Sequence, residues 1–393
     1  MINGTISRAC FICGSHDGET VFQTAIDVCG LGHVTFGMRC CSGCGMTLQD
    51  PAVSPETMMR QYSTFSNYTA FGDGEPPLNP TARRMLELVR IEGIKPGRMY
   101  DVGAATGSML WHFRKQGWAV AGCDLSPKAV EQARDRNDIA MDLGSGEESL
   151  PQRGNQDLIT FSHVLEHVYD PVETLNLVHE ALAPGGLLMF EVPCLAAPEI
   201  NPPGFFMMEH VNYFDEVTIG NLLKRIGFDV LQAPINTSLE YYCYPVITVL
   251  ARKQAPQPDA AIVNAHGKNM AFHRAFAAVE QGRWDAADAK LHAALAPGEE
   301  VYVWGAGLHT STLLERTSLN TRTRVRAITD RDPQKHGHTL GPHRVIAPAE
   351  VLADSRKIVL SSFQSEGNIA EGLLRQGIPE ERIVRPHGRS PSV

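Results

Sequence analysis

The segment MYDVGAATGS, residues 99–108, constrains the fold of this 393-residue chain more than any other. It places one acidic residue and two glycines, Asp101, Gly103 and Gly107, where an apolar strand gives way to a helical pattern. Glycine at 103 lets a ligand approach the backbone because it has no Cβ. Gly107 lets the following helix pack closely, while the free N–H groups of its first turn point toward the ligand. The segment therefore predicts a strand, a turn and a helix that bind a nucleotide-like cofactor.

A second acidic residue, Asp124, ends the next apolar run in the segment VAGCDLS. An acid about 20 residues after a glycine turn is where the ribose hydroxyls of a bound nucleotide lie in folds of this kind. Strand-like runs then alternate with helical patterns up to about residue 253. This alternation predicts a mainly parallel sheet that helices cover on both faces, with the cofactor at the carboxyl ends of the strands.

From Asp101 to Pro193, the order of these segments resembles that of the class I S-adenosylmethionine (SAM)-dependent methyltransferases. DVGAATGS resembles their SAM loop, and VAGCDLSPKAVEQAR resembles the second strand, its ribose-binding acid and the next helix. DLITFSHVLEHVYDPVETLNLVHEALAPGGLLMFEVP resembles the fourth strand, its helix and the fifth strand. The resemblance implies a SAM site formed by Asp101, Gly103, Ala104, Thr106, Gly107, Asp124, Leu125, Ser126 and His163.

A dinucleotide dehydrogenase is the alternative interpretation, because its fold uses the same strand, glycine turn and helix. Against it, the loop lacks the third glycine of the GxGxxG pattern. The Leu-x-Pro-Gly-Gly turn at residues 182–186 also favours a methyltransferase.

Length, charge and hydropathy limit the remaining possibilities. A chain of 393 residues is too long for one compact core, so we expect three domains. The net charge of −9 disfavours a nucleic-acid partner, because contacts with phosphates need a basic surface, although it leaves room for a local basic patch. No apolar run reaches the ~18 residues of a membrane span, and the first residues lack the basic and apolar regions of a signal peptide. We therefore expect a cytoplasmic protein without a membrane partner.

Four of the nine cysteines fall in two Cys-x-x-Cys pairs, Cys10 with Cys13 and Cys41 with Cys44. A glycine follows each pair, which suits the tight turns that let four thiolates converge on one tetrahedral ion. The pattern predicts a structural Zn²⁺ site in an N-terminal ribbon. A redox dithiol or a ribbon without metal is the alternative, and the neighbouring Cys40 leaves the choice of ligand open.

The run after the ribbon is rich in aromatic and hydroxyl side chains. A helix-like segment near residues 56–62 leads into YSTFSNY, residues 62–68. Tyr62 and Tyr68 present phenols that can hydrogen-bond to a substrate or to the SAM carboxylate. We predict that this run closes over the cofactor, with packing between domains as the alternative role of each tyrosine.

The sequence SHVLEH, residues 162–167, follows the apolar run LITF at the predicted rim of the cofactor site. It resembles a segment that is common in methyltransferases with an N-terminal zinc ribbon. The resemblance makes His163 a candidate for contact with substrate or SAM, and the same question arises for His167. The alternative for each histidine is a capping or packing role.

A further candidate constellation, FFMMEHVNYF at residues 205–214, lies after the expected fifth strand. Glu209, His210 and Tyr213 put an acid, a base and a phenol within five residues. Methyl transfer is an in-line displacement, so the protein must align the nucleophile and, where needed, remove a proton. His210 suits that task because a histidine titrates near neutrality, and Glu209 is placed to hold or polarise it. The alternative is that both side chains satisfy backbone groups of the loop.

After a Pro- and Gln-rich break at residues 254–258, a helical stretch extends to about Leu295. EVYVWGAG, residues 300–307, is then a second strand with a glycine turn, and Asp330 follows the next apolar strand. This layout repeats, on a smaller scale, that of the predicted SAM domain. One interpretation is that it binds a nucleotide, and the alternative is that it serves only for packing or dimerisation. The histidines of this region lack a metal-ligand spacing and are expected at the surface or in turns: His309, His336, His338 and His343.

A zinc ribbon, a SAM domain with an EHxxYF segment and a third domain together resemble the bacterial deoxysugar C-methyltransferases over nearly the whole chain. The resemblance implies a nucleotide-linked 4-keto sugar as substrate, with its nucleotide near the third domain. It implies that His210 removes the proton beside the ketone, so that the enolate carbon takes the methyl group. Glu209 matches the neighbour of that base, and His163 falls where the family has another active-site histidine. Tyr62 and Tyr68 lie in the region of its substrate tyrosines.

Two departures from that family bear on the substrate. The family often reads Tyr-His-Glu-His-x-x-Tyr-Phe, and this chain has Met207 and Met208 in place of the first two residues. The SAM loop has the generic DxGxxTG form, whereas the family frequently carries an Asn-Asp-Gly version. A different substrate is therefore compatible with the sequence.

The sequence thus predicts an α/β protein in three parts. These are a zinc-binding ribbon with a substrate-lid segment (residues 1–80), a SAM-binding methyltransferase domain with a Rossmann-like sheet (81–253), and a helical linker with a smaller Rossmann-like domain (254–393). C-methylation of a nucleotide-linked keto sugar is the favoured function, and its predicted catalytic residues are His210, Glu209, His163, Tyr68 and Tyr62. O- or N-methylation of another small metabolite and a non-catalytic SAM-binding scaffold are the alternatives. The sequence leaves open the sugar, the methylated atom and the choice between monomer and homodimer.

Overall fold

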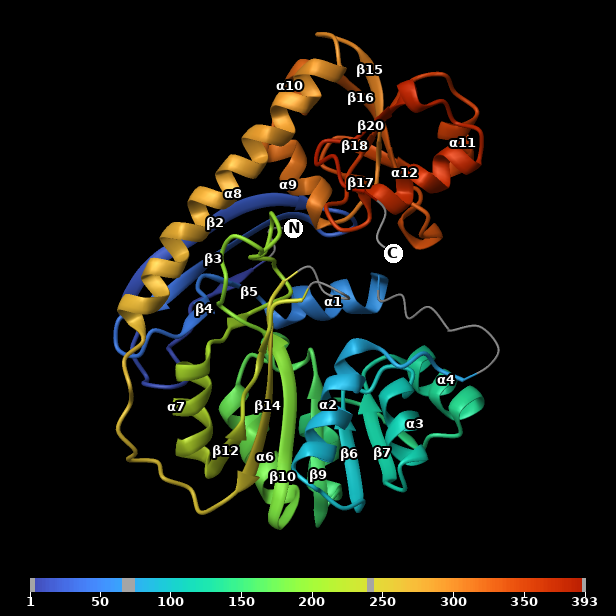
Figure 1. Cartoon of the computed structure of the whole chain (residues 1–393). Helices are drawn as coiled ribbons and strands as arrows, with labels where there is room; N and C mark the ends of the chain where they lie inside the picture. Colours follow the sequence, from blue (N-terminus) through green and yellow to red (C-terminus); the bar gives the residue numbers. More distant parts are fainter. Residues whose placement is uncertain (1–3, 66–74, 239–243, 391–393) are drawn as a thin grey trace.

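The computed structural model describes residues 4–65, 75–238 and 244–390, and for residues 62–65 only the backbone. It contains an N-terminal sheet, a central sheet with helices on both faces, and a C-terminal sheet (Figure 1). The N-terminal sheet lies between the other two. No helix within the described ranges is both long and apolar enough to span a membrane.

The N-terminal sheet is built on a long hairpin of β2 (Gly18–Val28) and β3 (Gly32–Cys41). Its strand order is β11-β4-β3-β2, with β4 (Thr47–Gln49) next to β3 and β11 (Asn212–Tyr213) at the edge. β11 comes from a much later part of the chain and pairs antiparallel with β4. The segment before β11 is therefore held against the N-terminal sheet. The other elements here are β1 (Thr5–Ile6), β5 (Ala52–Val53) and α1 (Pro55–Phe65).

The central sheet has the strand order β12-β14-β10-β9-β6-β7-β8, and β13 pairs with β14. The strands from β8 to β10 run parallel, whereas β14 and β12 are antiparallel to their neighbours. The strands are β6 (Arg98–Val102), β7 (Ala119–Asp124), β8 (Met141–Leu143), β9 (Gln156–Ser162), β10 (Leu182–Pro193), β12 (Phe228–Gln232), β13 (Ile235–Asn236) and β14 (Val246–Lys253). The prediction of a mainly parallel sheet is confirmed.

Alternate residues of these strands point to opposite faces, as the strand period of two requires. Tyr100 and Phe161 pack with α6 and α7, while Met99 and Leu158 pack with α2, α3 and α4. Such continuous apolar runs are typical of strands that helices cover on both sides. The helices and 3-10 turns are α2 (Pro80–Ile91), α3 (Ser108–Lys115), α4 (Pro127–Asn137), α5 (Gly146–Ser149), η1 (Leu150–Gln152), η2 (Leu165–His167), α6 (Pro171–Ala181) and α7 (Glu216–Ile226).

The long helix α8 (His266–Ala294) connects the N-terminal sheet to the C-terminal sheet. Its first half packs Phe272 and Phe276 into the core beneath β2 and β3. Its second half packs Trp284 and Leu291 into the core of the C-terminal sheet. Figure 1 shows α8 running along β2 and β3 toward that sheet.

The C-terminal sheet has the order β17-β18-β16-β15-β19-β20, and its central strands are parallel. Its strands are β15 (Glu300–Trp304), β16 (Arg324–Thr329), β17 (Thr339–Leu340), β18 (His343–Ile346), β19 (Lys357–Leu360) and β20 (Ile383–Val384). Its helices and turns are α9 (Leu308–Arg316), α10 (Leu319–Arg322), η3 (Pro333–Lys335), α11 (Pro348–Leu352), α12 (Glu366–Arg375) and η4 (Glu380–Arg382). Because α9 packs on β2, this region also contacts the N-terminal sheet.

Candidate functional site

The turn between β6 and α3 has the backbone that its glycines predict. Gly103 and Gly107 both have φ of 73°, in the left-handed region that favours glycine. A Cβ on Gly107 would lie 3.3 Å from the Cβ of Ala133 on α4, so this glycine does allow close helix packing. A Cβ on Gly103 would lie 2.4 Å from Val164 Cγ2. Contact with Val164 therefore also favours glycine at 103, and the expected approach of a ligand stays a prediction.

Asp124 at the end of β7 is buried and holds this turn in place. Its Oδ2 accepts a hydrogen bond from Ala105 N at 2.9 Å, and its Oδ1 accepts one from Ser126 N at 2.8 Å. Leu125 beside it is 49% exposed, and Leu143, which pairs with Asp124 across β7 and β8, is 59% exposed. A carboxylate next to two exposed leucines offers a partner for ribose hydroxyls and an apolar surface for a purine ring, so these residues fit the adenosyl part of SAM.

The other predicted cofactor residues lie along the same edge. Asp101 is buried and accepts a hydrogen bond from Thr160 Oγ1 at 2.6 Å. Burial raises the pKa of Asp101 to about 7. Ala104 and Thr106 are buried in the turn, and Ser126 caps α4 by accepting a hydrogen bond from Ala129 N at 3.3 Å. The structure thus brings the predicted loop residues together at the carboxyl ends of β6 and β7.

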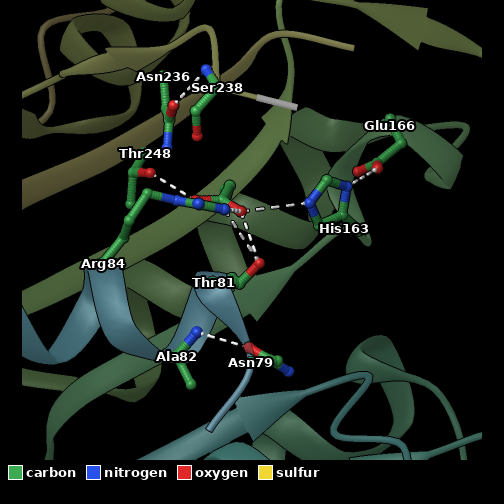
Figure 2. Close-up of polar contacts among 10 residues, drawn as sticks. Asn79, Thr81, Ala82, Arg84, His163, Glu166, Asn236, Ser238 and Thr248 are labelled. Atoms are coloured by element: carbon green, nitrogen blue, oxygen red, sulfur yellow. Dashed lines mark hydrogen bonds and ion pairs between the residues drawn. The ribbon is translucent and has the colours of Figure 1, made fainter. Parts of the chain in front are cut away.

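A cluster of buried charges lies beside this turn and centres on Glu191 of β10. Arg84 donates to both carboxylate oxygens of Glu191, at 2.6 and 2.7 Å. Thr81 Oγ1 and Thr248 Oγ1 also donate to Glu191, at 2.7 and 2.6 Å. Burial raises the pKa of Glu191, but Arg84, His163 and Thr248 outweigh it and lower this pKa to about 2. Figure 2 shows Thr81 and Arg84 of α2 and Thr248 of β14 among these polar contacts.

His163 connects this cluster to a second buried carboxylate, that of Glu166. Its Nδ1 lies 3.2 Å from Glu166 Oε1, and its Nε2 lies 3.4 Å from Glu191 Oε1 (Figure 2). Burial alone would lower the pKa of His163, but the two carboxylates raise it to about 9. The residue also has φ of 55°, which is unusual for a side chain other than glycine. At neutral pH, His163 is therefore a charged link between two carboxylates and is not poised to accept a proton.

His210 is the neutral histidine of the site. Burial and then the charge of His167 lower its pKa to about 3, while Glu166 acts in the opposite direction. The ring centroids of His210 and His167 are 4.8 Å apart, and His210 Nδ1 is buried without a hydrogen-bond partner among the described residues. His167 Nδ1 donates to Glu209 O at 2.8 Å, which turns its Nε2 toward Glu166, 4.0 Å away. Two histidines and one carboxylate thus meet around one point.

The carboxylate beside His210 is that of Glu166, whereas the sequence pointed to Glu209. Glu209 Oε2 is buried without a hydrogen-bond partner in the described part of the chain, and burial raises the pKa of Glu209 to about 7. Nothing in its contacts ties this carboxylate to the imidazole of His210. Glu166, in contrast, bonds to His163 and is ionised, because its pKa is lowered to about 2 despite burial. In the structure, Glu166 is the carboxylate that meets His167 and His210, while the predicted role of Glu209 stays a prediction.

The structure does not describe the side chains of the two predicted phenols. Tyr68 lies outside the described residues, and Tyr62 lies in α1 with its side chain not described. Tyr213 donates to Phe205 O and accepts from Met207 N, both at 2.9 Å, so it holds the loop and has no free hydroxyl for a substrate. Tyr244, just before β14, lies with its ring centroid 6.2 Å from that of His163 and 6.3 Å from that of His210. Among the described residues, Tyr244 is a tyrosine whose ring lies near both histidines.

A cavity of about 470 Å³ extends from this site toward the C-terminal sheet. Glu209, His210 and His167 line one end. The walls come from β2, β3, the loop Pro202–Met208 and α8, and the far end comes from α9 and the loop Ser362–Gln364. Hydrogen bonds from Gln49 N and Arg8 Nη1 to Val211 O anchor the His210 loop on the N-terminal region. Strands of the N-terminal sheet and loops and helices of the other two regions therefore line one cavity.

Residues 80–233 match the protein family described as a methyltransferase domain. The match extends from α2 to β12 and includes the turn with the predicted SAM loop. C-methyltransferase NovU of Streptomyces niveus is 28% identical over 221 residues, which cover 54% of this chain and 48% of that protein. A ubiquinone biosynthesis O-methyltransferase of Aromatoleum aromaticum is 32% identical over 119 residues, which cover 29% of this chain and 50% of that protein. The chain thus spans about half the length of the curated relatives it matches.

A solved structure, magnesium protoporphyrin IX methyltransferase from Synechocystis PCC 6803 with bound SAH, has a TM-score of 0.40 and 17% identity. The alignment covers 51% of this chain and 100% of that structure.

Outside the methyltransferase domain, the four predicted cysteine ligands come together. Cys10 Sγ lies 3.4 Å from Cys44 Sγ, and Cys13 Sγ lies 3.4 Å from Cys41 Sγ. All four sulfurs lie within 4.8 Å of one another, which is compatible with the edge of roughly 3.8 Å in a tetrahedron with Zn–S bonds of about 2.3 Å. Cys40 is directed elsewhere, because its Sγ lies 3.6 Å from Gly45 O and 3.7 Å from His266 Nδ1.

Sequence reasoning missed most of the charged cluster in the methyltransferase domain. Glu191 stands inside the apolar run LLMFEVP, and an acid at such a position is rarely buried unless it is paired, so this signal was available. Arg84 and Thr248 carried no comparable signal, because they join the cluster only through the packing of α2 and β14 against β10.

Proposed function

We propose that this protein transfers a methyl group from SAM to a carbon atom of a nucleotide-linked keto sugar. One observation carries this proposal. The same cavity has His210 at one end and, at the other, a C-terminal sheet whose fold resembles that of nucleotide-binding domains. Its volume of about 470 Å³ is in the range of sites for ligands of this size. The similarity to a C-methyltransferase and the resemblance to deoxysugar C-methyltransferases favour a carbon acceptor.

The residues that would hold SAM are those of the β6 and β7 edge. Asp124 would accept the ribose hydroxyls, and Leu125 and Leu143 would face the adenine ring. When bound there, SAM supplies an electrophilic methyl group: a C–C bond forms with the substrate carbanion as the S–CH₃ bond breaks, and SAH leaves with the electron pair. The protein's own task is to bring the substrate carbon into line and to remove its proton.

His210 is the residue that would remove that proton. The low pKa of His210 keeps the ring neutral, so a ring nitrogen is available for the proton of the carbon beside the ketone, and the charge of Glu166 opposes the loss of basicity that burial causes. The imidazolium that forms lies near the ionised Glu166, whose negative charge stabilises it. His163 and Arg84 keep the buried carboxylates ionised, so the charge that assists His210 is present before the substrate binds.

The test is mass spectrometry of dTDP-4-keto-6-deoxyglucose incubated with the protein in heavy water, first without SAM and then with it. Deuterium uptake at the carbon beside the ketone, followed by methyl gain, supports C-methylation. Loss of both in His210→Gln, with circular dichroism unchanged, identifies His210 as the base. A wild-type protein that gives neither exchange nor methyl gain with this substrate and other keto sugars contradicts the proposal.

O- or N-methylation of another small metabolite is the second candidate. It is favoured by Met207 and Met208, which stand where the sugar enzymes have a tyrosine and a histidine, and by the ubiquinone O-methyltransferases among the relatives. Methyl transfer to a hydroxyl or an amine gives no exchange of a carbon-bound hydrogen. The heavy-water experiment therefore separates the two candidates.

We also propose that Cys10, Cys13, Cys41 and Cys44 bind one structural Zn²⁺. Three of them are buried, and together they leave no open coordination position for a substrate. Elemental analysis of the purified protein is expected to give one zinc per chain, and Cys44→Ser is expected to lose it, whereas Cys40→Ser keeps it. Full zinc content in Cys44→Ser would contradict this assignment.

A further inference from the structure

The end of the cavity farthest from His210 carries an arginine that makes no direct ion pair with the described residues. Arg316, the last residue of α9, lines the cavity together with His309 and Thr312 of the same helix. Arg316 makes no hydrogen bond or ion pair with any residue that the structure describes. Its neighbour Glu315 is turned away to accept a hydrogen bond from Thr24 Oγ1 at 3.1 Å. A guanidinium is thus left available toward the cavity.

Two more guanidinium groups lie around Phe363, which lines the same end. Arg389 lies 4.6 Å and Arg283 lies 5.8 Å from the centroid of the Phe363 ring. Arg283 donates from Nη2 to Glu199 O, beside the loop that lines the cavity, while its Nη1 is buried without a hydrogen-bond partner among the described residues. The two like charges lie close enough for Arg389, after burial, to lower the pKa of Arg283.

The nearby carboxylates make no direct ion pair with these arginines among the described residues, although Glu280, which also lines the cavity, attracts Arg316 and Arg283 at longer range. Glu280 accepts a hydrogen bond from Gly204 N at 2.9 Å, and Glu366 accepts from His387 N and Arg389 N at 2.8 and 2.6 Å. Neither carboxylate forms an ion pair with the residues that the structure describes. Burial raises the pKa of both carboxyl groups, while Arg316 and Arg283 act in the opposite direction on that of Glu280. Lys290, which donates to His387 O at 2.8 Å, adds a further positive charge.

We propose that Arg283, Arg316 and Arg389, which we call the arginine end, bind the diphosphate of the nucleotide-linked substrate. The chain as a whole has a net charge of −9, so this group of arginines does not follow from a basic overall composition. Guanidinium groups match phosphate oxygens with two parallel N–H bonds, so the free Nη1 of Arg283 and the unpaired Arg316 are suited to this ligand. The inference rests on the proposed function, because it makes the diphosphate the anchor that places the sugar at His210.

The test is calorimetric binding of thymidine diphosphate, inorganic pyrophosphate and thymidine to the full chain. Arg316→Gln and Arg283→Gln are each expected to weaken binding of thymidine diphosphate by about 10-fold or more, and the double variant by about 100-fold. The binding of the wild-type protein is expected to weaken with salt, and thymidine is expected to bind equally weakly to all variants. Arg274→Gln, an exposed position on the same helix α8, serves as the matched control and is expected to bind like the wild type.

Two results would contradict the proposal that the arginine end binds the diphosphate. One is a double variant that binds thymidine diphosphate as tightly as the wild type, and the other is a wild type that binds neither thymidine diphosphate nor pyrophosphate. Enzyme assays distinguish failure of this diphosphate site from failure of the proposed function. If a keto sugar nucleotide is methylated with the same KM by wild type and double variant, the arginine end fails and the proposed function stands. If the variants lose thymidine diphosphate while no keto sugar is methylated, the arginine end stands and the sugar proposal fails.

Discussion

The carboxyl edges of the central and C-terminal sheets carry the same local geometry. In both, a glycine turn follows the first strand, and an aspartate at the end of the next strand accepts a hydrogen bond from the alanine of that turn. The distance is 2.9 Å from Asp124 Oδ2 to Ala105 N and 2.8 Å from Asp330 Oδ2 to Ala306 N. In the C-terminal sheet, Lys335 also binds Asp330, at 3.0 Å. The backbone motif is thus repeated, while the surroundings of its carboxylate are not.

The buried histidines at the two edges differ even more. His163 lies between two carboxylates, and its pKa is raised to about 9. His309 lies between Ser361 Oγ, at 3.0 Å, and His387 Nε2, at 2.9 Å, and burial lowers its pKa to about 3. His309 was expected at the surface or in a turn, and that expectation was wrong, because it lies half-buried in α9. The central edge thus holds a protonated histidine between two carboxylates, whereas the histidine at the C-terminal edge is neutral.

The largest expected effect is on kcat. It distinguishes His210, at one end of the cavity, from His336, at the C-terminal edge. His210→Gln is expected to lower kcat by about 10²- to 10⁴-fold, the usual contribution of a general base. His336→Gln, after β16, is expected to keep the wild-type kcat, because this histidine bonds only to Asp330 O among the described residues. Single-turnover methylation assays measure both. Equal losses in the two variants would remove the functional difference between the edges.

The paired aspartates give the next prediction. Asp124→Asn is expected to weaken binding of SAH by about 10- to 100-fold, because it replaces a charged acceptor at the ribose position. Asp330→Asn is expected to leave SAH binding unchanged. Isothermal titration of SAH measures both. A loss of SAH affinity in Asp330→Asn that equals that of Asp124→Asn would mean that the C-terminal edge also takes part in cofactor binding.

The two glutamates near His210 sharpen the description of the central edge. Glu166→Gln is expected to lower kcat by about 10- to 100-fold, equivalent to about 1.4–2.8 kcal/mol of transition-state stabilisation, because it removes the charge that stabilises the imidazolium. Glu209→Gln is expected to have a smaller effect on kcat. The measurement is kcat and KM for both variants, with thermal unfolding as the control for folding. A larger loss of kcat in Glu209→Gln would restore the pairing that the sequence suggested.

The smallest expected effects are on stability and have opposite signs of pH dependence. The pKa of His163 is raised above its unfolded value of 6.5, so its contribution is fully present below pH 6.5 and is lost as pH rises through about 9. The pKa of His309 is lowered, so its contribution is present above pH 6.5 and is lost as pH falls toward about 3. Urea unfolding across pH, with slopes of up to ~1 kcal/mol per pH unit, is expected to flatten on the alkaline side in His163→Gln and on the acid side in His309→Gln. Identical profiles for the two variants would contradict this contrast.

The features that the sequence predicted well are local in the chain. Gly103 and Gly107 predicted the turn because positive φ is a property of single residues. The two Cys-x-x-Cys pairs predicted which sulfurs converge, since each pair lies in one tight turn. Asp124 was found because it ends an apolar run at a fixed spacing from the turn. The C-terminal sheet followed for the same reason, from the repeated strand, glycine turn and acid.

Only the tertiary structure decided which side chains, distant in sequence, interact through charges and hydrogen bonds. Glu191, Arg84, His163 and Thr248 lie far apart in sequence and meet because β10 lies between β9 and β14 and α2 packs beside them. The same packing makes Glu166 the carboxylate near His210 and opens one cavity between three sheets. Backbone geometry at a glycine depends on one residue and can be read from it. The pKa of a buried group depends on every charge that the fold places around it, so it appears only once the strands have their neighbours.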